Sequence, residues 1–166
     1  RFAAAQGYRV TAIDISAVML EYVRAKAAKE GLQRLETQHS GFLSMDFLSG
    51  SFDAVISGAA LHHLPDAWKL VALSNIVRVL KPGGQFVLSD VVFKLKGDEP
   101  PEGCFVKFIE SFNDKIRSGA MGHVKKEYST YDWIMEGLLA QAGFNILSVK
   151  VCSESFFVYH CRRKSL

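Results

Sequence analysis

The side chains best suited to proton transfer in this sequence are two adjacent histidines, His62 and His63, and an aspartate, Asp90. Imidazole and carboxylate groups can take a proton from an attacking nucleophile. Each of the three lies just beyond a short apolar run that is typical of a buried strand. We therefore name them as candidate catalytic residues. Other roles stay open, because a histidine here can cap the next helix or pack under a lid, and the aspartate can serve as a helix cap or a hydrogen-bonding group.

Residues 52–90 contain the elements that must position these side chains. Ala54–Ile56 is too short for a helix and is β-branched enough for a buried strand. Lys81–Gly84 ends the helix that follows, and Phe86–Leu88 makes a second strand. A strand-helix-strand unit of this length predicts two parallel neighbouring strands. The helix, predicted over about 67–80, has one apolar face made of Trp68, Val71, Ala72, Ile76 and Val79.

Two further stretches can contact a ligand. Ser57–Ala60 consists of small residues, which let a ligand approach the backbone closely. Asp14 ends the predicted strand Tyr8–Asp14, and a carboxylate at the carboxyl end of a strand can accept hydrogen bonds from both hydroxyls of a ribose. Asp14 could instead cap the helix predicted from Ala17, but Ser16 is the better N-cap for that helix.

Three sequence motifs in residues 51–84 stand in one order and register. They read SFDAVIS at 51–57, ALHHL at 60–64 and RVLKPGG at 78–84. This combination resembles the class I S-adenosylmethionine-dependent methyltransferases. The resemblance implies an α/β fold with a doubly wound, mostly parallel sheet and a C-terminal antiparallel hairpin strand. It also implies S-adenosyl-L-methionine as cofactor and methyl transfer to a small-molecule acceptor.

The same resemblance assigns cofactor contacts to particular residues. Asp14 would bind the ribose, and Met19 would lie against the adenine ring, although a core methionine is the other interpretation. At the position of Gly41 the family has an aspartate that binds the adenine amino group, so this sequence departs from the pattern there. The backbone N–H of Phe42 is then the polar group expected to bind the adenine ring. The residues that we predict to contact the cofactor are Asp14, Ile15, Met19, Gly41, Phe42, Ser57, Gly58 and Ala59.

The first residues suggest an incomplete N-terminus. Arg1–Gln6 reads as the last turns of a helix that is closed by Gly7. The family's first strand and its glycine-rich loop, which hold the methionine part of the cofactor, would precede such a helix. We therefore expect both to be missing from this chain.

No linker or repeat divides the rest, so we predict one domain over residues 1–166. Residues 91–127 read as an insertion that can act as a substrate lid, with His123 and Glu127 as weaker catalytic candidates. Ser129–Asp132 matches a capping box and predicts a helix to Ala142. Two strands over 144–151 and 156–161 follow, as an antiparallel hairpin.

Composition excludes several other classes. The net charge is only +3, and the one local basic excess is Arg162–Lys164, so no nucleic-acid partner is expected. Three cysteines without a CxxC motif argue against a metal site or disulfide framework and for a cytoplasmic protein. No apolar run approaches the roughly 20 residues that span a membrane. The oligomeric state cannot be read. A non-catalytic relative and a nicotinamide-dependent oxidoreductase stay as alternatives, because a dehydrogenase also places an acid after its second strand.

Overall fold

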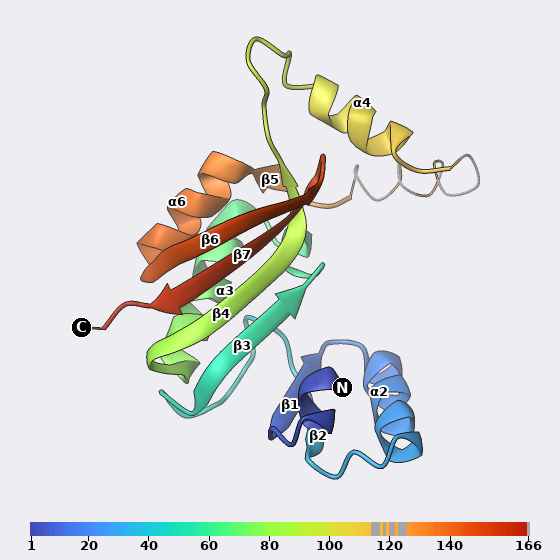
Figure 1. The fold of residues 1–166 in the computed structure, drawn as a ribbon, viewed down its shortest axis with the longest axis vertical. Helices are drawn as coiled ribbons and strands as arrows, with labels where there is room; N and C mark the ends of the chain where they lie inside the picture. The colour runs from blue at the N-terminus through green and yellow to red at the C-terminus, as the bar shows by residue number, and fades with distance from the viewer. Residues whose placement is uncertain (114–116, 118, 120–121, 123–125, 166) are drawn as a thin grey trace. The chain divides into compact units, whose positions relative to one another are not determined.

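The structure is a computed structural model that describes residues 1–113, 117, 119, 122 and 126–165 (Figure 1). The chain divides into two units, Arg1–Asp46 and Phe47–Leu166, which are treated separately below. The single domain over residues 1–166 therefore stays a prediction. Among the described residues, no helix combines the length and the apolar character that a membrane crossing requires.

The first unit is a small α/β layer. It contains α1 (Phe2–Ala5), β1 (Val10–Asp14), α2 (Ala17–Lys29) and β2 (Leu35–His39). The two strands pair in parallel, with Val10 opposite Leu35 and Asp14 opposite His39. Gly7 has φ +87°, which agrees with the predicted glycine end of the first helix. The carboxyl ends of β1 and β2 thus lie together, which is the edge where ligands bind in α/β sheets.

The second unit is built on a mixed sheet with the order β3-β4-β7-β6 (Figure 1). Its strands are β3 (Phe52–Gly58), β4 (Leu80–Phe93), β6 (Phe144–Ser153) and β7 (Phe156–Arg163), and the short β5 (Thr130–Tyr131) also pairs with β4. β3 and β5 run parallel to β4, whereas β7 runs antiparallel to both β4 and β6. The predicted parallel strand pair and the antiparallel C-terminal hairpin are both confirmed.

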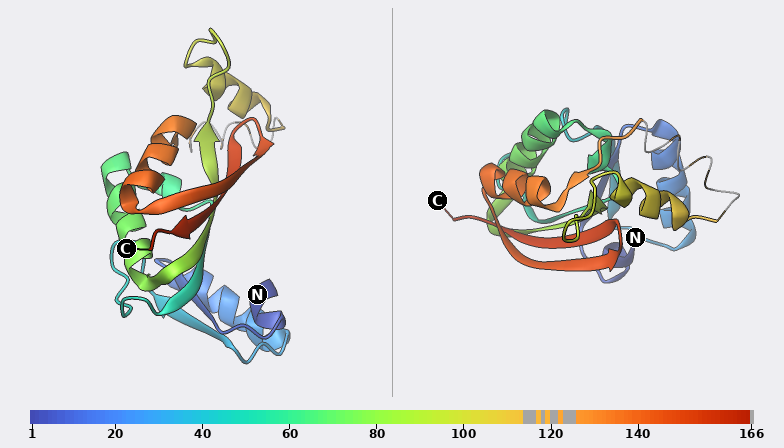
Figure 2. Two further views of the ribbon diagram at one scale, coloured as in Figure 1. Left: turned by 60° about the vertical axis from the view of Figure 1, so that its left-hand side comes forward. Right: turned by 90° about the horizontal axis from the view of Figure 1, so that it is seen from above.

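The helices of this unit are η1 (Leu61–His63), α3 (Asp66–Val79), α4 (Gly103–Glu110) and α6 (Asp132–Ala142). Figures 1 and 2 show α3 and α6 side by side on one face of the sheet. Alternate residues of β4 point to that face, since Phe86, Leu88 and Val92 are fully buried. The core of the unit therefore lies between β4 and these two helices.

The buried face of α3 differs from the predicted one. Trp68 is 53% exposed and Val71 is 44% exposed, so neither belongs to the core. Lys69 and Leu73 are buried instead, together with the predicted Ala72, Ile76 and Val79. Apolar periodicity alone cannot select this face, because one of the residues that turns inward is a lysine. Its ammonium group finds polar partners in the interior, as described below.

One prediction next to the insertion was also wrong. Ser129 is not the N-cap of α6, because Thr130 and Tyr131 pair with Val92 and Phe93 of β4 and the helix begins only at Asp132. The insertion over 91–127 stays a prediction, and β4 continues into that range as far as Phe93. Strand pairing satisfies backbone groups that a capping box would otherwise satisfy, so tertiary structure determined this boundary.

α4 packs on the end of β4 rather than standing alone. The rings of Phe105 and Phe108 lie 4.8 and 5.7 Å from the ring of Phe93, both in edge-on arrangements. Edge-to-face aromatic pairs at these distances are favourable beyond their buried area. The predicted helical stripe over about 102–118 is thus present over Gly103–Glu110, and its later part, with Ile116 and Ser118, falls outside the described residues.

Candidate functional site

Asp90 is the buried acid at the centre of the site. It shares the inward face of β4 with Phe86 and Leu88, because side chains alternate along a strand, and it is fully buried. A buried carboxylate is costly unless hydrogen bonds satisfy it. The sequence therefore places a charge inside the protein at a point where the surrounding residues must supply donors.

The loop after β3 supplies two of these donors. Ala59 has a positive φ of 47°, which is uncommon for a residue with a side chain, and its N–H donates to the carbonyl of Ser89 at 2.8 Å. This sharp turn at the end of β3 leads into η1. Backbone strain of this kind is often found where a loop must present functional groups in one orientation.

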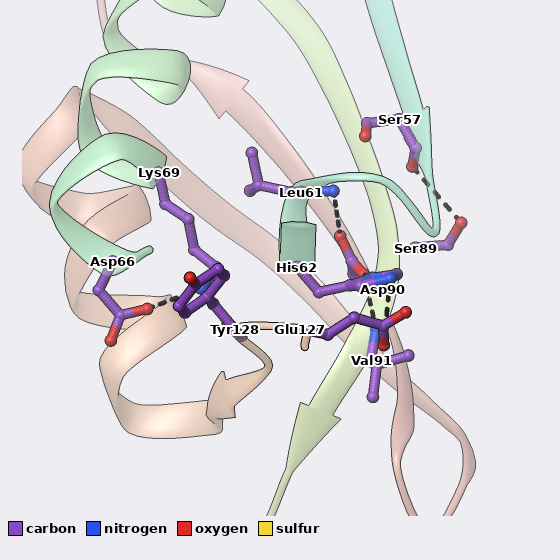
Figure 3. Close-up of polar contacts among 10 residues, drawn as sticks. All are labelled: Ser57, Leu61, His62, Asp66, Lys69, Ser89, Asp90, Val91, Glu127 and Tyr128. Carbon is purple, nitrogen blue, oxygen red and sulfur yellow. Dashed lines mark hydrogen bonds and ion pairs between the residues drawn. The ribbon is translucent and has the colours of Figure 1, made fainter. Parts of the chain in front are cut away.

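Three groups donate to the Asp90 carboxylate (Figure 3). The backbone N–H of Leu61 lies 2.9 Å from Oδ2, and that of Val91 lies 2.8 Å from Oδ1. The ring of His62 makes a short hydrogen bond from Nδ1 to Oδ1. A carboxylate only accepts, so Nδ1 carries the proton and Nε2 is the atom that can exchange one. His62 and Asp90, two of the three predicted catalytic residues, therefore form one buried pair.

The surroundings of His62 act on its pKa in opposite directions. Burial alone would lower the pKa, because it disfavours the charged ring. The hydrogen bond and charge of Asp90, together with the charge of Glu127, outweigh burial and the opposing charge of Lys69. The pKa of His62 is therefore raised above its ordinary value, and the ring is well suited to receive a proton.

His63 is exposed and differs from His62 in its contacts. Its ring lies 4.3 Å from that of His62, measured between centroids. One polar atom each from His62, His63 and Glu127 lie within 4.8 Å of one another. No metal site was expected from the sequence, because its three cysteines form no CxxC motif.

In the first unit, Asp14 ends β1 as predicted. Its Oδ1 accepts from the N–H of Ser16 at 2.8 Å, and the Ser16 hydroxyl in turn accepts from the N–H of Met19 at 3.3 Å. Ser16 is thus the N-cap of α2, as expected. Met19 is 48% exposed, which does not agree with a core methionine and leaves its side chain accessible to a ligand.

Gly41 lies close to Ile15 at the same end of the strands. A Cβ atom added at Gly41 would be 2.7 Å from Cγ2 of Ile15, a separation that packed atoms do not tolerate. The Gly41 N–H donates to the Ser44 hydroxyl at 2.9 Å. Ile15 is 78% exposed and Phe42 is half-buried, so two apolar side chains lie beside Gly41.

In the second unit, Ser57, Gly58 and Ala59 form the end of β3 and its turn. Ser57 is buried, and its hydroxyl oxygen has no hydrogen-bond partner among the described residues. Gly58 and Ala59 are exposed. A buried hydroxyl without a partner is uncommon in folded proteins and often marks a place where a ligand or water binds.

Sequence reasoning underrated one residue of the site and missed two. Glu127 ranked as a weaker candidate, yet its carboxylate lies 3.7 Å from Nε2 of His62. Lys69 and the backbone of Tyr128 were not considered, although both contact the site through hydrogen bonds. A lysine at an inward helical position was the one available signal. His123, the other weaker candidate, lies outside the described residues.

Comparisons with known proteins show the family. A family model described as a methyltransferase domain matches residues 1–88, just over half of the chain. A demethylmenaquinone methyltransferase of Staphylococcus epidermidis is 32% identical over 155 residues, which is 86% of this chain and 60% of the relative. The chain belongs to the class I S-adenosylmethionine-dependent methyltransferases. It spans about 60% of the length of the curated relatives that it matches.

Solved structures show the same fold. The Burkholderia thailandensis 1,6-didemethyltoxoflavin-N1-methyltransferase, solved with 1,6-didemethyltoxoflavin and S-adenosylhomocysteine, aligns with a TM-score of 0.70 over 99% of this chain and 65% of its own, at 20% identity. The [4+2]-cyclase SpnF aligns with a TM-score of 0.72 over 95% of this chain and 67% of its own, at 18% identity. The predicted α/β methyltransferase fold is therefore confirmed.

Proposed function

We infer that the protein transfers a methyl group from S-adenosyl-L-methionine to a small-molecule acceptor. The observation that carries this proposal is the buried Asp90–His62 pair at the carboxyl end of β4, in a chain of the methyltransferase family. Family membership supports the cofactor. The pair supports a role in removing the acceptor's proton.

The candidate cofactor residues fit a nucleoside ligand in three respects. Asp14 offers a carboxylate at a strand end, where it can accept from ribose hydroxyls. Gly41 presents its backbone without a side chain, since a Cβ atom there would meet Ile15. The Ser57 hydroxyl still lacks a partner within the described part of the chain. In the first unit these features support contacts from Asp14, Ile15, Met19, Gly41 and Phe42. In the second unit, the contacts proposed for Ser57, Gly58 and Ala59 rest on the Ser57 hydroxyl alone.

When bound, the cofactor supplies a methyl group on a good leaving group, so little covalent help is needed from the protein. Nε2 of His62 would accept the proton that the acceptor's O–H, N–H or other nucleophilic group loses on methylation. Asp90 holds the ring in the correct tautomer and stabilises its charged form. The exposed His63 would help to bind the acceptor, and α4, packed on the end of β4, would cover it as a lid.

The reaction can be tested in two stages. Calorimetric titration of the protein with S-adenosyl-L-methionine comes first, and the proposal fails if no heat of binding is seen at millimolar cofactor. Transfer of label from the methyl-labelled cofactor to a panel of small hydroxyl, amine and thiol compounds follows. His62→Ala should lower kcat by about 10²–10⁴-fold with cofactor affinity unchanged. His160→Ala is the matched control, because the ring of His160 bonds to Gln85 and takes no part in the site.

A non-catalytic or differently catalytic relative is the second candidate. It is supported by the likeness to the [4+2]-cyclase SpnF, because one fold can carry unrelated chemistry. Cofactor binding without label transfer to any acceptor would favour it. The cytosol is the compartment that fits either function, since Cys104, Cys152 and Cys161 are all free thiols.

A further inference from the structure

Nε2 of His62 has a second acidic neighbour besides the one on Nδ1. The Glu127 carboxylate lies 3.7 Å from Nε2, and the Glu127 side chain is only 11% exposed (Figure 3). The ring is thus placed between two carboxylates, one from β4 and one from the stretch just before β5. Glu127 is 65 positions after His62, so something must hold the two together.

The residues that follow Glu127 attach it to the histidine loop. The N–H of Tyr128 donates to the carbonyl oxygen of His62 at 2.8 Å. The carbonyl of Tyr128 accepts a short hydrogen bond from the ammonium group of Lys69. The hydroxyl of Thr130 donates to Oδ2 of Asp66 at 3.2 Å. Segment 127–130 is therefore joined to η1 and α3 by three hydrogen bonds.

Lys69 is central to this attachment. Its side chain is fully buried on the inward face of α3, and its ammonium group lies 2.7 Å from Oδ1 of Asp66 in addition to the Tyr128 carbonyl. A buried ammonium group is costly, and an apolar side chain would suit this face better. A leucine or methionine could not bind the Tyr128 carbonyl. A lysine at this position therefore serves to bind the Tyr128 carbonyl rather than to fill the core.

We propose that Lys69 and Glu127 are positioning residues for His62: Lys69 holds segment 127–130 against the histidine loop, and Glu127 stabilises the protonated ring. Among the described residues, the charged or titratable groups that face the ring are Asp90 from β4, Glu127, Lys69 from α3 and His63 from η1. The catalytic meaning rests on the proposed function. The acceptor's proton moves to Nε2 and then passes to water, which returns the ring to its neutral form.

The pKa of His62 tests the proposal. It is measured by NMR titration of the ring signals in the whole protein without cofactor. Glu127→Gln should lower this pKa by about 0.5–1 pH unit, because it removes one of the two negative neighbours. Glu136→Gln, on the exposed side of α6, is the matched control and should leave the pKa unchanged. An unchanged pKa in Glu127→Gln would overturn the proposal.

Lys69 requires a double-mutant cycle, since its own positive charge opposes protonation of His62. In a Lys69→Met background, Glu127→Gln should shift the pKa of His62 by less than about 0.2 pH unit, because segment 127–130 is no longer held. Asp66→Asn provides a second background if Lys69→Met does not fold. Faster hydrogen exchange of the Tyr128 amide should accompany either change. An equal effect of Glu127→Gln in all backgrounds would show that Lys69 does not position it.

Two further measurements separate this inference from a metal site and from the methyl-transfer proposal. Zn²⁺ added to the protein should not bind tightly at His62, His63 and Glu127; micromolar binding that is lost in Glu127→Gln would assign a metal site and overturn the proposal. If methyl transfer is observed, the acid limb of kcat/KM should move with the pKa of His62 in Glu127→Gln. The NMR readout stands even if the methyl-transfer proposal fails.

Discussion

The ring of His62 and the carboxylate of Asp90 are hydrogen-bonded across 28 positions of the sequence, and both groups are buried. The same carboxylate accepts from the Leu61 N–H, so one residue orients the ring and also anchors the loop that carries it. Asp90 therefore contributes both to the structure of the loop and to the orientation of the His62 ring. Changes at this residue should alter folding stability as well as proton transfer.

Asp90→Asn should destabilise the protein by about 2–4 kcal/mol. An asparagine cannot accept from the Leu61 N–H, the Val91 N–H and the His62 ring together, since one of its two terminal atoms is a donor. Urea unfolding measures the loss. Asp53→Asn is the control, because Asp53 pairs with Lys81 at the surface; equal losses in the two variants would contradict the assigned role of Asp90.

The contribution of His62 to stability should decline as the pH rises. Its pKa is raised in the folded protein, so the stabilisation is fully present below the unfolded value of about 6.5 and is lost as the pH passes the folded pKa. The difference in unfolding free energy between the wild type and His62→Gln should thus be larger at about pH 5.5 than at about pH 8.5. A difference that grows with pH would mean that the ring is held neutral.

Asp14→Asn should weaken binding of S-adenosyl-L-methionine by roughly 1–3 kcal/mol, which is about 5–150-fold. The asparagine keeps an oxygen for the Ser16 N–H but loses one acceptor for the ribose. Calorimetric titration gives the affinity. Glu36→Gln, on the exposed side of the neighbouring β2, should bind the cofactor as the wild type does; unchanged affinity in Asp14→Asn would exclude the ribose contact.

The two candidate helix caps should respond differently to alanine. Ser16→Ala removes the acceptor of the Met19 N–H and should cost about 1 kcal/mol in unfolding free energy. Ser129→Ala should change it by less than about 0.5 kcal/mol, because Ser129 does not cap α6. Both values come from chemical denaturation. A larger loss at Ser129 would show that the residue supports β5 or α6 in a way that its contacts do not reveal.

Local patterns were sufficient where a single periodicity or a capping residue determines an element. Ser16 was predicted as a cap and is one, and the terminal hairpin has the predicted antiparallel order. Local patterns failed where contacts with residues distant in the sequence determine the orientation or the secondary structure of a residue. Lys69 turns inward because Asp66 and the Tyr128 carbonyl bind its ammonium group, and Tyr131 joins a strand because β4 is beside it.

The sequence by itself determined the family, the parallel strand pair around α3 and three candidate catalytic residues, because motifs and apolar periodicity are local properties. It did not separate His62 from His63, and it placed Asp90 only somewhat better for a role near the acceptor. Only the tertiary structure separated them: the inward side of β4 buries Asp90, the turn at Ala59 brings His62 to it, and His63 stays exposed. Glu127 and Lys69 join the site only in space, since hydrogen bonds between residues 59 positions apart leave no local signal in the sequence.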